Sequence, residues 1–157
     1  MKHHADDGLD RESTLDTAAL FELADRAASR AGVRLTRVRR HVYRLLIEAG
    51  EPLSAYEIVD RLEGIACPKP PTAYRALECL ERIGLVRKIR SISKFVALRS
   101  GPTDAPQAFL ICRTCGSAEQ VAATKESIAL RERAERFGFT SLDPTIELIG
   151  RCSEHPD

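Results

Sequence analysis

Four residues in the last third of the chain have the types and the spacing of a zinc site. Cys112 and Cys115 form a C-x2-C pair in "FLICRTCG", and Cys152 and His155 form a C-x2-H pair in "GRCSEH". Three thiolates and one imidazole are the ligand set of a closed, tetrahedral structural zinc site. Because a segment of about fifty residues has too small a core to be stable alone, a metal cross-link would stabilise it. The sequence therefore predicts one structural Zn²⁺ per chain.

A free dithiol is the alternative for the first pair. A redox pair of the thioredoxin type lies at the start of a helix that follows a strand. Here Gly116 and a strand-like segment follow Cys115, which favours zinc. A thiol-based redox or peroxide-sensing role for Cys112 and Cys115 stays open as the alternative. Cys67 and Cys79 are isolated in the sequence, and we expect them to be inert thiols.

Composition restricts the class of protein. The chain has 157 residues, of which 43% are hydrophobic, which is enough for one large domain or two small ones. No apolar run approaches the roughly 18–20 residues that span a bilayer, so no membrane partner is expected. The first residues, "MKHHADDGLDREST", do not resemble a signal peptide. Reduced cysteines used as ligands favour a cytoplasmic protein.

The net charge of +1 conceals an uneven distribution. Residues 30–100 carry 15 basic and 7 acidic side chains, a net charge of +8, whereas residues 101–157 have a net charge of −3. A basic block of this kind is typical of a surface that binds a polyanion such as nucleic acid. A solvated arginine-rich face is the other interpretation, and charge alone does not separate the two.

Helices are expected in the larger, first part of the basic block and just before it. Apolar periodicity predicts a first helix over residues 15–31, and Thr36 can cap a second. Ser54 and Glu57 form an S-x-x-E capping box, which predicts a third helix over residues 54–63. A proline-rich connector then leads to a fourth helix over residues 71–83.

Extended segments follow the helices. "LVRKI" and "KFVAL", joined by "RSIS", predict a two-stranded hairpin, so that the outline is a winged helix. Helix-turn-helix geometry then makes helix 71–83 the DNA-recognition helix. After a linker at 100–107, the strand-like "AFLIC", "SAEQVA" and "PTIELIG" and a helix at about 124–137 predict a small second domain. The predicted fold is α+β, with a disordered tail (1–13), a winged-helix domain (14–99) and a zinc-stabilised domain (108–157).

The fourth helix carries the candidate DNA contacts. Its predicted exposed positions are Thr72, Arg75, Glu78, Cys79 and Arg82. Arg75 can reach guanine O6 and N7 in the major groove. Thr72, Tyr74 and the free N–H groups at the helix start can bind phosphate. Tyr74 could instead be a core aromatic, and Arg75 could instead pair with Glu78 or Glu81.

Further contacts are expected around this helix. Tyr56, in the first turn of the third helix, could contact a phosphate or a base. The basic residues expected to flank the DNA are Lys69, Arg87, Lys88 and Arg90, together with Arg37 and Arg40 on the outer face of the second helix.

Several segments together resemble the ferric uptake regulator family over about residues 20–155. They are "LTRVRRHVYRLL", "PLSAYEIVDRLE", "PKPPTAYRALECLERIGLVRKI" and "FLICRTCG…GRCSEH", and two of them are most similar to the zinc uptake branch. The resemblance implies a metal-responsive transcriptional repressor, not an enzyme, with a C-terminal dimerisation domain. Tyr56, Tyr74 and Arg75 fall on positions that face DNA in this family. Cys112, Cys115 and Cys152 fall on zinc ligands, and His155 replaces the usual fourth cysteine.

The sequence departs from the family at the sensory metal site. That site uses a His after the "GLV" turn, a Cys or Glu at the end of the wing, and a His-rich stretch before the first C-x2-C. Here those places read Arg87, "FVALR" and "SGPTDAPQA", and Glu119 would be a lone carboxylate ligand. Ordinary zinc sensing is therefore not implied, and a second, regulatory zinc stays open. Repression could be independent of metal, respond to another signal, or use other ligands, although His3, His4 and His41 have no assigned role.

The combined interpretation is a cytoplasmic repressor that binds double-stranded DNA. A homodimer would place two recognition helices in successive major grooves of a palindromic operator. A zinc-containing dimerisation adaptor without DNA binding is a further alternative, which the basic excess disfavours. A hydrolase is not indicated, since the sequence has no Ser–His–acid set, phosphate loop or open zinc site.

Overall fold

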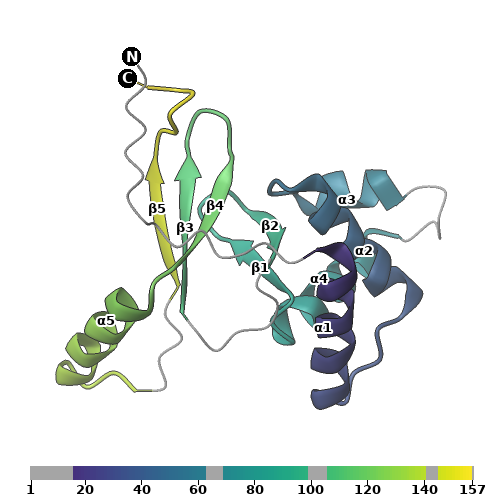
Figure 1. The fold of residues 1–157 in the computed structure, drawn as a ribbon, viewed down its shortest axis with the longest axis horizontal. Coiled ribbons are helices and arrows are strands. Elements are labelled where there is room, and N and C mark those ends of the chain that lie inside the picture. The colour runs from purple at the N-terminus through teal and green to yellow at the C-terminus, as the bar shows by residue number, and fades with distance from the viewer. Residues whose placement is uncertain (1–15, 63–68, 99–105, 141–144, 157) are drawn as a thin grey trace.

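The computed structural model describes residues 16–62, 69–98, 106–140 and 145–156, and it has the expected α+β fold. The helices are α1 (Thr17–Arg30), α2 (Arg37–Ala49), α3 (Ala55–Leu62), α4 (Pro70–Arg82) and α5 (Thr124–Arg136). The strands are β1 (Val86–Ile89), β2 (Lys94–Ala97), β3 (Gln107–Cys112), β4 (Ala118–Ala122) and β5 (Ile146–Gly150). Figure 1 shows α1–α4 grouped on one side, the sheet of β3, β4 and β5 on the other, and α5 beyond the end of that sheet.

Some predictions fall outside these residues. They are the tail at 1–13 with His3 and His4, the end of the third helix at Gly64, the isolated Cys67, and the linker at 100–107 up to its last two positions. The described part of the linker contradicts its predicted end, because Gln107 is already the first residue of β3. None of the described helices combines the length and the apolar character needed to cross a bilayer.

Local capping signals fix where the first two helices begin. The Asp16 carboxylate accepts a hydrogen bond from the Ala19 N–H at 2.7 Å and starts α1. The Thr36 hydroxyl accepts one from the Arg39 N–H at 3.4 Å, which confirms the predicted cap of α2. Gly50 then ends α2 with φ +64°, a left-handed conformation that glycine adopts without steric cost.

The capping box of α3 has formed in both directions. The Ser54 hydroxyl accepts a hydrogen bond from the Glu57 N–H at 3.2 Å, and the Glu57 carboxylate accepts one from the Ser54 N–H at 2.7 Å. Hydrogen bonds to this carboxylate from the Ser54 backbone N–H, the largest cause, and from the Ser54 side chain lower the pKa of Glu57 from 4.5 to about 2. Lys94 Nζ lies 3.3 Å from the same carboxylate and lowers the pKa further. The helix that precedes α4 is thus fixed at its start and tied to β2.

Glu57→Gln should therefore destabilise the protein in a pH-dependent way. Because the pKa is lowered in the folded state, the charged carboxylate stabilises the fold above pH 4.5, and this contribution disappears as the pH falls towards 2. The difference in free energy of unfolding between wild type and variant, from urea titrations, should shrink over that window. In a Ser54→Ala background, which itself costs about 1 kcal/mol, Glu57→Gln should have a smaller effect. An equal effect in both backgrounds would show that the Ser54 hydroxyl and the Glu57 carboxylate act independently, because the Ser54 N–H is still present in the Ser54→Ala variant.

The wing is the antiparallel β1–β2 hairpin. Val86 pairs with Ala97 and Ile89 with Lys94, and an isolated bridge joins Leu53 to Phe95. The bridge connects the hairpin to the turn before α3, with N–H···O distances of 2.7 and 3.0 Å between these two residues. The predicted winged helix is confirmed, with the wing attached at the start of its positioning helix.

The C-terminal sheet has the strand order β4-β3-β5. β3 and β4 form an antiparallel hairpin, whereas β5 pairs with β3 in parallel. A parallel neighbour cannot be reached through a tight turn, so β4 and α5 lie in the connection. β3 is the central strand and mostly buried, while β4 and β5 are edges.

Two apolar clusters organise the interior. The larger one lies within the winged helix, and its fully buried side chains include Tyr43, Leu46, Ile58, Leu77 and Leu80. The second cluster joins the wing to the C-terminal sheet. Its buried members are Ile89 and Leu98 from the hairpin side and Phe109 and Ile111 from β3. The wing therefore packs against the sheet.

Candidate metal centre and nucleic-acid interface

The first zinc knuckle is the turn between β3 and β4. Cys112 is the last residue of β3, and its carbonyl accepts a hydrogen bond from the Gly116 N–H at 2.9 Å. The Cys112 N–H donates to the Ser117 carbonyl, also at 2.9 Å. Gly116 makes the turn possible with φ +73°. The turn thus brings Cys115 back beside Cys112.

Parallel strand pairing brings the second knuckle to the first. Cys112 is opposite Gly150 in the β3–β5 register, and the Arg113 N–H donates to the Gly150 carbonyl at 2.9 Å. The chain then turns back so that the His155 N–H donates to the Cys152 carbonyl at 2.9 Å. The two knuckles therefore lie side by side at the same end of the β3–β5 pair.

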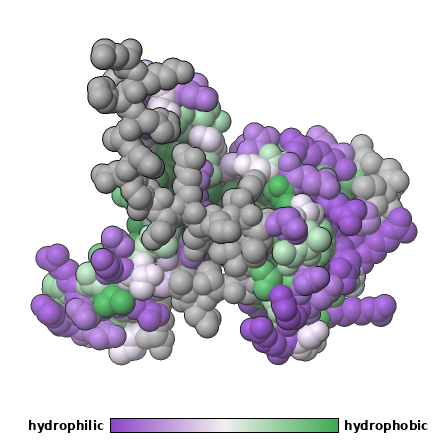
Figure 2. Space-filling view, in the orientation of Figure 1, coloured by the Kyte–Doolittle hydropathy of each residue, from purple (hydrophilic) through white to green (hydrophobic). Residues whose placement is uncertain are grey.

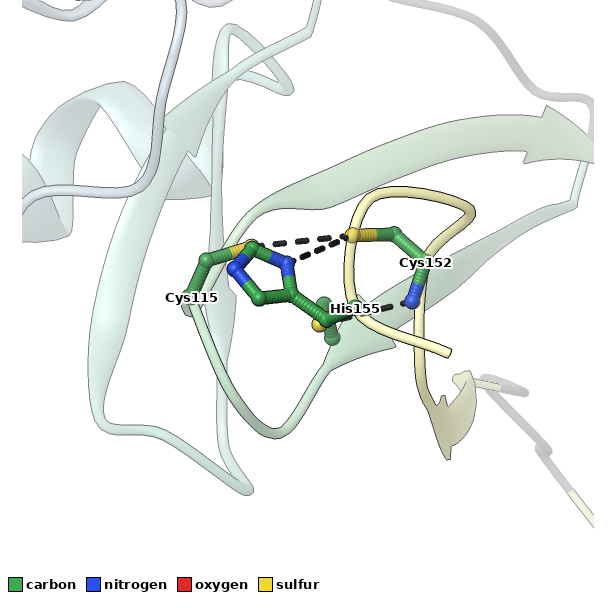
Figure 3. Close-up of side chains that lie close together, drawn as sticks. Cys115, Cys152 and His155 are labelled. Atoms are coloured by element: carbon green, nitrogen blue, oxygen red, sulfur yellow. Dashed lines mark hydrogen bonds between the residues drawn. The ribbon is translucent and has the colours of Figure 1, made fainter. Parts of the chain in front are cut away.

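The four predicted ligands converge. The sulfur atoms of Cys112, Cys115 and Cys152 and a ring nitrogen of His155 all lie within 4.8 Å of one another. Cys115 Sγ lies 3.9 Å from Cys152 Sγ, which in turn lies 3.1 Å from His155 Nδ1, and Figure 3 shows these side chains turned toward one another. Tetrahedral zinc with Zn–S bonds of about 2.3 Å separates two sulfur ligands by about 3.8 Å. The donor set and its spacing fit Zn²⁺, and four protein ligands leave no position for a reacting water.

The thiol environment also suits a metal. Cys112 is 4% exposed, and backbone N–H groups of Cys115 and Cys152 point at its sulfur, the latter at 3.4 Å. These hydrogen bonds lower the pKa of Cys112 from 9.0 to about 6. Burial raises the pKa of Cys152, and the neighbouring sulfurs raise it further. Ionised together, the thiols repel one another, and a bound dication offsets that repulsion.

The surroundings of Cys115 differ from those of a redox dithiol. In the described residues the knuckle leads into β4, an extended strand, and not into a helix whose N-terminus would activate a thiolate. Cys115 is exposed, and its sulfur lies 3.1 Å from the Ser117 hydroxyl. The local structure is that of a metal knuckle.

The predicted recognition helix α4 has a buried and an exposed face. Ala73, Ala76, Leu77 and Leu80 are buried against the rest of the winged helix. Thr72 and Arg75 are exposed, and Tyr74 is 41% exposed, so it is not a core aromatic. No ion pair between Arg75 and Glu78 or Glu81 occurs in the described part of the chain. The neighbouring helix α3 presents Tyr56, whose side chain is 75% exposed.

Two expectations for α4 were wrong. Cys79 is buried rather than exposed, with Arg82 Nη2 3.9 Å from its sulfur. The free N–H groups expected at the helix start are also missing there. Pro70 and Pro71 have no N–H, and the Thr72 N–H donates to the Lys69 carbonyl at 2.8 Å. A phosphate at this end would be bound by side chains, such as those of Thr72 and Lys69.

The arginines of α2 are mostly engaged within the protein. Arg40 forms an ion pair with Asp25, and Arg39 Nη1 donates to the Arg34 carbonyl at 2.6 Å. The Arg44 guanidinium lies 5.3 Å from the centre of the Phe21 ring. Arg37 is exposed at the start of the helix. Of the two predicted contacts on α2, the surroundings of Arg37 fit DNA binding better than those of Arg40.

The wing contributes further cations. Arg87 and Lys88 are half-buried, with Lys88 Nζ 5.7 Å from the centre of the Phe95 ring, while Arg90 is exposed in the hairpin turn. Arg87 occupies the position at which a sensory His is expected. It does not belong to a group of His, Cys, Asp or Glu side chains that could hold a metal. In the residues that the structure describes, the four knuckle residues form the one such group.

Sequence reasoning missed Glu147 on β5. Its carboxylate accepts hydrogen bonds from the N–H groups of Arg90 and Ser91, at 2.8 and 3.0 Å, which lie 57 and 56 residues earlier in the chain. A single charge inside the apolar run "TIELIG" was the available signal, since an isolated carboxylate in a strand needs a partner.

Comparisons with known proteins agree with this architecture. A model described as the ferric uptake regulator family matches residues 30–149. The chain belongs to this family. A relative, the zinc uptake regulation protein of Escherichia coli K12, is 34% identical over 140 residues, which are 87% of this chain and 81% of that protein. The resemblance to the zinc uptake branch is thereby confirmed.

Solved structures of family members show the same fold. A zinc uptake regulator complexed with zinc and DNA aligns with a TM-score of 0.80 and 32% identity, over 89% of this chain and 95% of that one. Holo XcZur aligns with a TM-score of 0.77 over 87% of this chain and 96% of its own. Apo XcZur aligns with a TM-score of 0.51 over 88% of this chain and 97% of its own. Both XcZur forms are 36% identical to this chain.

Proposed function

We propose that this family member is a cytoplasmic transcriptional repressor, not an enzyme, that binds a palindromic operator as a homodimer. The observation that carries the proposal is the 0.80 alignment with a zinc uptake regulator complexed with zinc and DNA. Independent support comes from the winged helix itself, whose α4 exposes polar and basic side chains within the segment of net charge +8.

The residues of this surface have different roles in the proposal. Arg75, one turn into α4, reads a guanine edge in the major groove. Tyr56, Thr72 and Tyr74 contact the phosphate backbone or adjacent bases. Lys69 and Arg37 supply positive charge at the rim, and Arg40 contributes less because Asp25 already pairs with it. Phosphate contacts orient α4, and Arg75 supplies sequence discrimination.

Zinc has a structural role in this proposal. Cys112, Cys115, Cys152 and His155 would hold one ion per chain, and the ion would supply a cross-link between the β3–β4 turn and the segment after β5. Outside the sheet, α5 has only Ser127 fully buried, so the C-terminal part has little core of its own. Arg87 stands where the family has a sensory His and offers no metal-ligating atom, so no regulatory zinc is included.

Apolar surface supports a homodimer. Leu110 on β3 and Leu148 on β5 are paired in the register and are 41% and 57% exposed. On α5, Ile128 and Leu130 are about half exposed, and Phe137 just beyond it is 75% exposed. Figure 2 shows green apolar atoms among the purple ones on α5 at the lower left. Exposed apolar surface of this extent is typical of an interface, and a two-fold axis would pair the half-sites of a palindrome.

The salt dependence of DNA binding tests the proposal. A duplex selected from a random pool should bind two chains, and the logarithm of its affinity should fall linearly with the logarithm of salt concentration. The slope should be about −0.9 for each phosphate neutralised. Fluorescence anisotropy gives the affinity, and sedimentation of the complex gives the stoichiometry. Enrichment of no sequence and a flat salt response would favour the adaptor without DNA binding. Affinity that changes with thiol oxidation at constant zinc content would favour the redox regulator.

A further inference from the structure

Glu147 forms a contact between the two halves of the chain that the proposed function does not use. It lies opposite Phe109 in the β3–β5 register, on the sheet face that meets the wing. Each carboxylate oxygen accepts one backbone N–H of the wing turn, from Arg90 at 2.8 Å and from Ser91 at 3.0 Å. Partial burial raises the pKa of Glu147, but hydrogen bonds from the Ser91 side chain and from the Ser91 and Arg90 N–H groups outweigh that effect and hold the pKa below its ordinary value. The carboxylate is therefore charged, and both bonds are charge-assisted.

The wing turn contains one residue in a left-handed conformation. The Ser93 N–H donates to the Arg90 carbonyl at 3.3 Å and closes the turn. Ser93 adopts φ +53°, a left-handed conformation that residues other than glycine rarely adopt. A carboxylate that binds two successive N–H groups of such a turn favours this conformation over alternatives. We call the pairing of Glu147 with the Arg90 and Ser91 N–H groups the wing clasp.

An apolar contact lies beside the clasp. Ile89, Leu98, Phe109 and Ile111 are at most 3% exposed, and partly buried Ile92 and Val96 of the hairpin pack on them. The hydrogen bonds of the wing clasp require a particular geometry, whereas the apolar contacts of the cluster do not. The cluster therefore holds the wing near the sheet, and the clasp fixes the orientation of the wing. Because the hairpin follows α4 directly and is bridged to the start of α3, the same contacts orient α4.

The chain as a whole aligns better with one form of a relative than with the other. At the same sequence identity, the TM-score is 0.77 with holo XcZur and 0.51 with apo XcZur. In this chain the contacts between wing and sheet are made by a carboxylate, two N–H groups and apolar side chains. None of the described residues around that joint forms a second cluster of metal-binding side chains.

We propose that Glu147 is a positioning residue that fixes the wing and α4 on the C-terminal sheet, so that the DNA-binding arrangement does not depend on a regulatory metal. The inference rests on the proposed function, since it concerns how the same DNA-binding surface is held. In this proposal the wing clasp joins the two halves of the chain.

Three variants test the inference. Glu147→Gln keeps the shape but removes the charge, and Glu147→Ala removes both acceptors. Glu126→Gln removes one negative charge from an exposed position at the start of α5 and is the matched control. Zinc content and dimer mass, measured for each, show whether the fold is intact. The readouts are hydrogen exchange of the Arg90 and Ser91 amides by NMR and affinity for the selected duplex.

The two amides should be protected in the wild type and in Glu126→Gln. In both Glu147 variants they should exchange about tenfold faster, and affinity for the duplex should fall by about tenfold, as expected for losing charge-assisted hydrogen bonds. Wild-type affinity should not change when a mild chelator removes weakly bound zinc and leaves one ion per chain.

Three results would overturn the inference. The amides could be unprotected in the wild type, or the Glu147 variants could lose protection and still bind the duplex as the wild type does. Chelation of weakly bound zinc could also reduce wild-type affinity to the level of the Glu147 variants, which would show that a metal holds the arrangement. If the wild type binds no duplex at all, the proposed function fails, whereas amide exchange still decides whether Glu147 holds the wing.

Discussion

Cys112→Ser is expected to abolish tight zinc binding and to unfold much of the C-terminal sheet. Cys112 is the most buried of the four ligands and receives backbone N–H groups from both knuckles, so no other residue can replace it. Structural zinc contributes an apparent 10–16 kcal/mol in small zinc-binding peptides, about the whole stability of a domain. Zinc content should fall from one ion per chain to well below one, and the dimer should dissociate. Atomic absorption and sedimentation measure the two effects.

Two further variants separate the metal from general damage to the turn. Ser153→Ala lies between two ligands of the second knuckle, is exposed, and should keep both zinc and dimer. His155→Cys should also keep one zinc, because it restores a four-thiolate set that binds zinc equally well. A stable, zinc-free and dimeric Cys112→Ser protein would contradict the structural role of the metal.

Arg75→Ala is expected to weaken binding to the selected duplex by about 1–3 kcal/mol and to relax specificity at one base-pair position. The side chain is exposed on α4, and no acidic neighbour pairs with it in the described residues, so its guanidinium is available for a guanine. Affinity for random DNA should change much less. Anisotropy titrations against the selected duplex, its single-base variants and random DNA distinguish these effects.

Arg82→Ala is the matched control for Arg75→Ala. It removes the same charge from the same helix, but Arg82 lies in the last turn of α4 beside the Cys79 sulfur. Its effect on the selected duplex and on random DNA should be small and similar. If Arg75→Ala also weakened both equally, Arg75 would be a phosphate contact and the base-reading residue would lie elsewhere.

Local features of the sequence were sufficient for most of the helices. Thr36, Ser54 and Glu57 act on groups within three residues, and their hydrogen bonds formed as predicted. The ligands of the metal centre were also predictable, because cysteine and histidine at knuckle spacing have few other uses. The burial of Cys79 could have been inferred, since it lies one helical turn after Ala76 on the edge of the apolar stripe.

Contacts that depend on tertiary arrangement were not predictable in this way. The parallel direction of β5 follows from how the chain returns after α5, which periodicity does not specify. The Arg40–Asp25 ion pair and the wing clasp join residues 15 and 56–57 positions apart. The sequence pattern around an exposed arginine is the same whether its side chain faces DNA or a carboxylate. Only the packing of α1 on α2 shows that Arg40 faces Asp25.

The parallel pairing of β3 and β5 also sets the order in which the metal centre can be completed during synthesis. Cys112 and Cys115 leave the ribosome 37–40 residues ahead of Cys152, or about 2–8 s at ordinary translation rates. For that interval the nascent chain offers two thiolates, which hold zinc weakly. Because β5 must first reach its place beside β3, with β4 and α5 already made, the ion becomes tightly bound only on a nearly finished fold. If zinc has the proposed structural role, tightly bound zinc would mark a completed chain, and zinc on chains that stall before β5 would still exchange with the cellular metal pool.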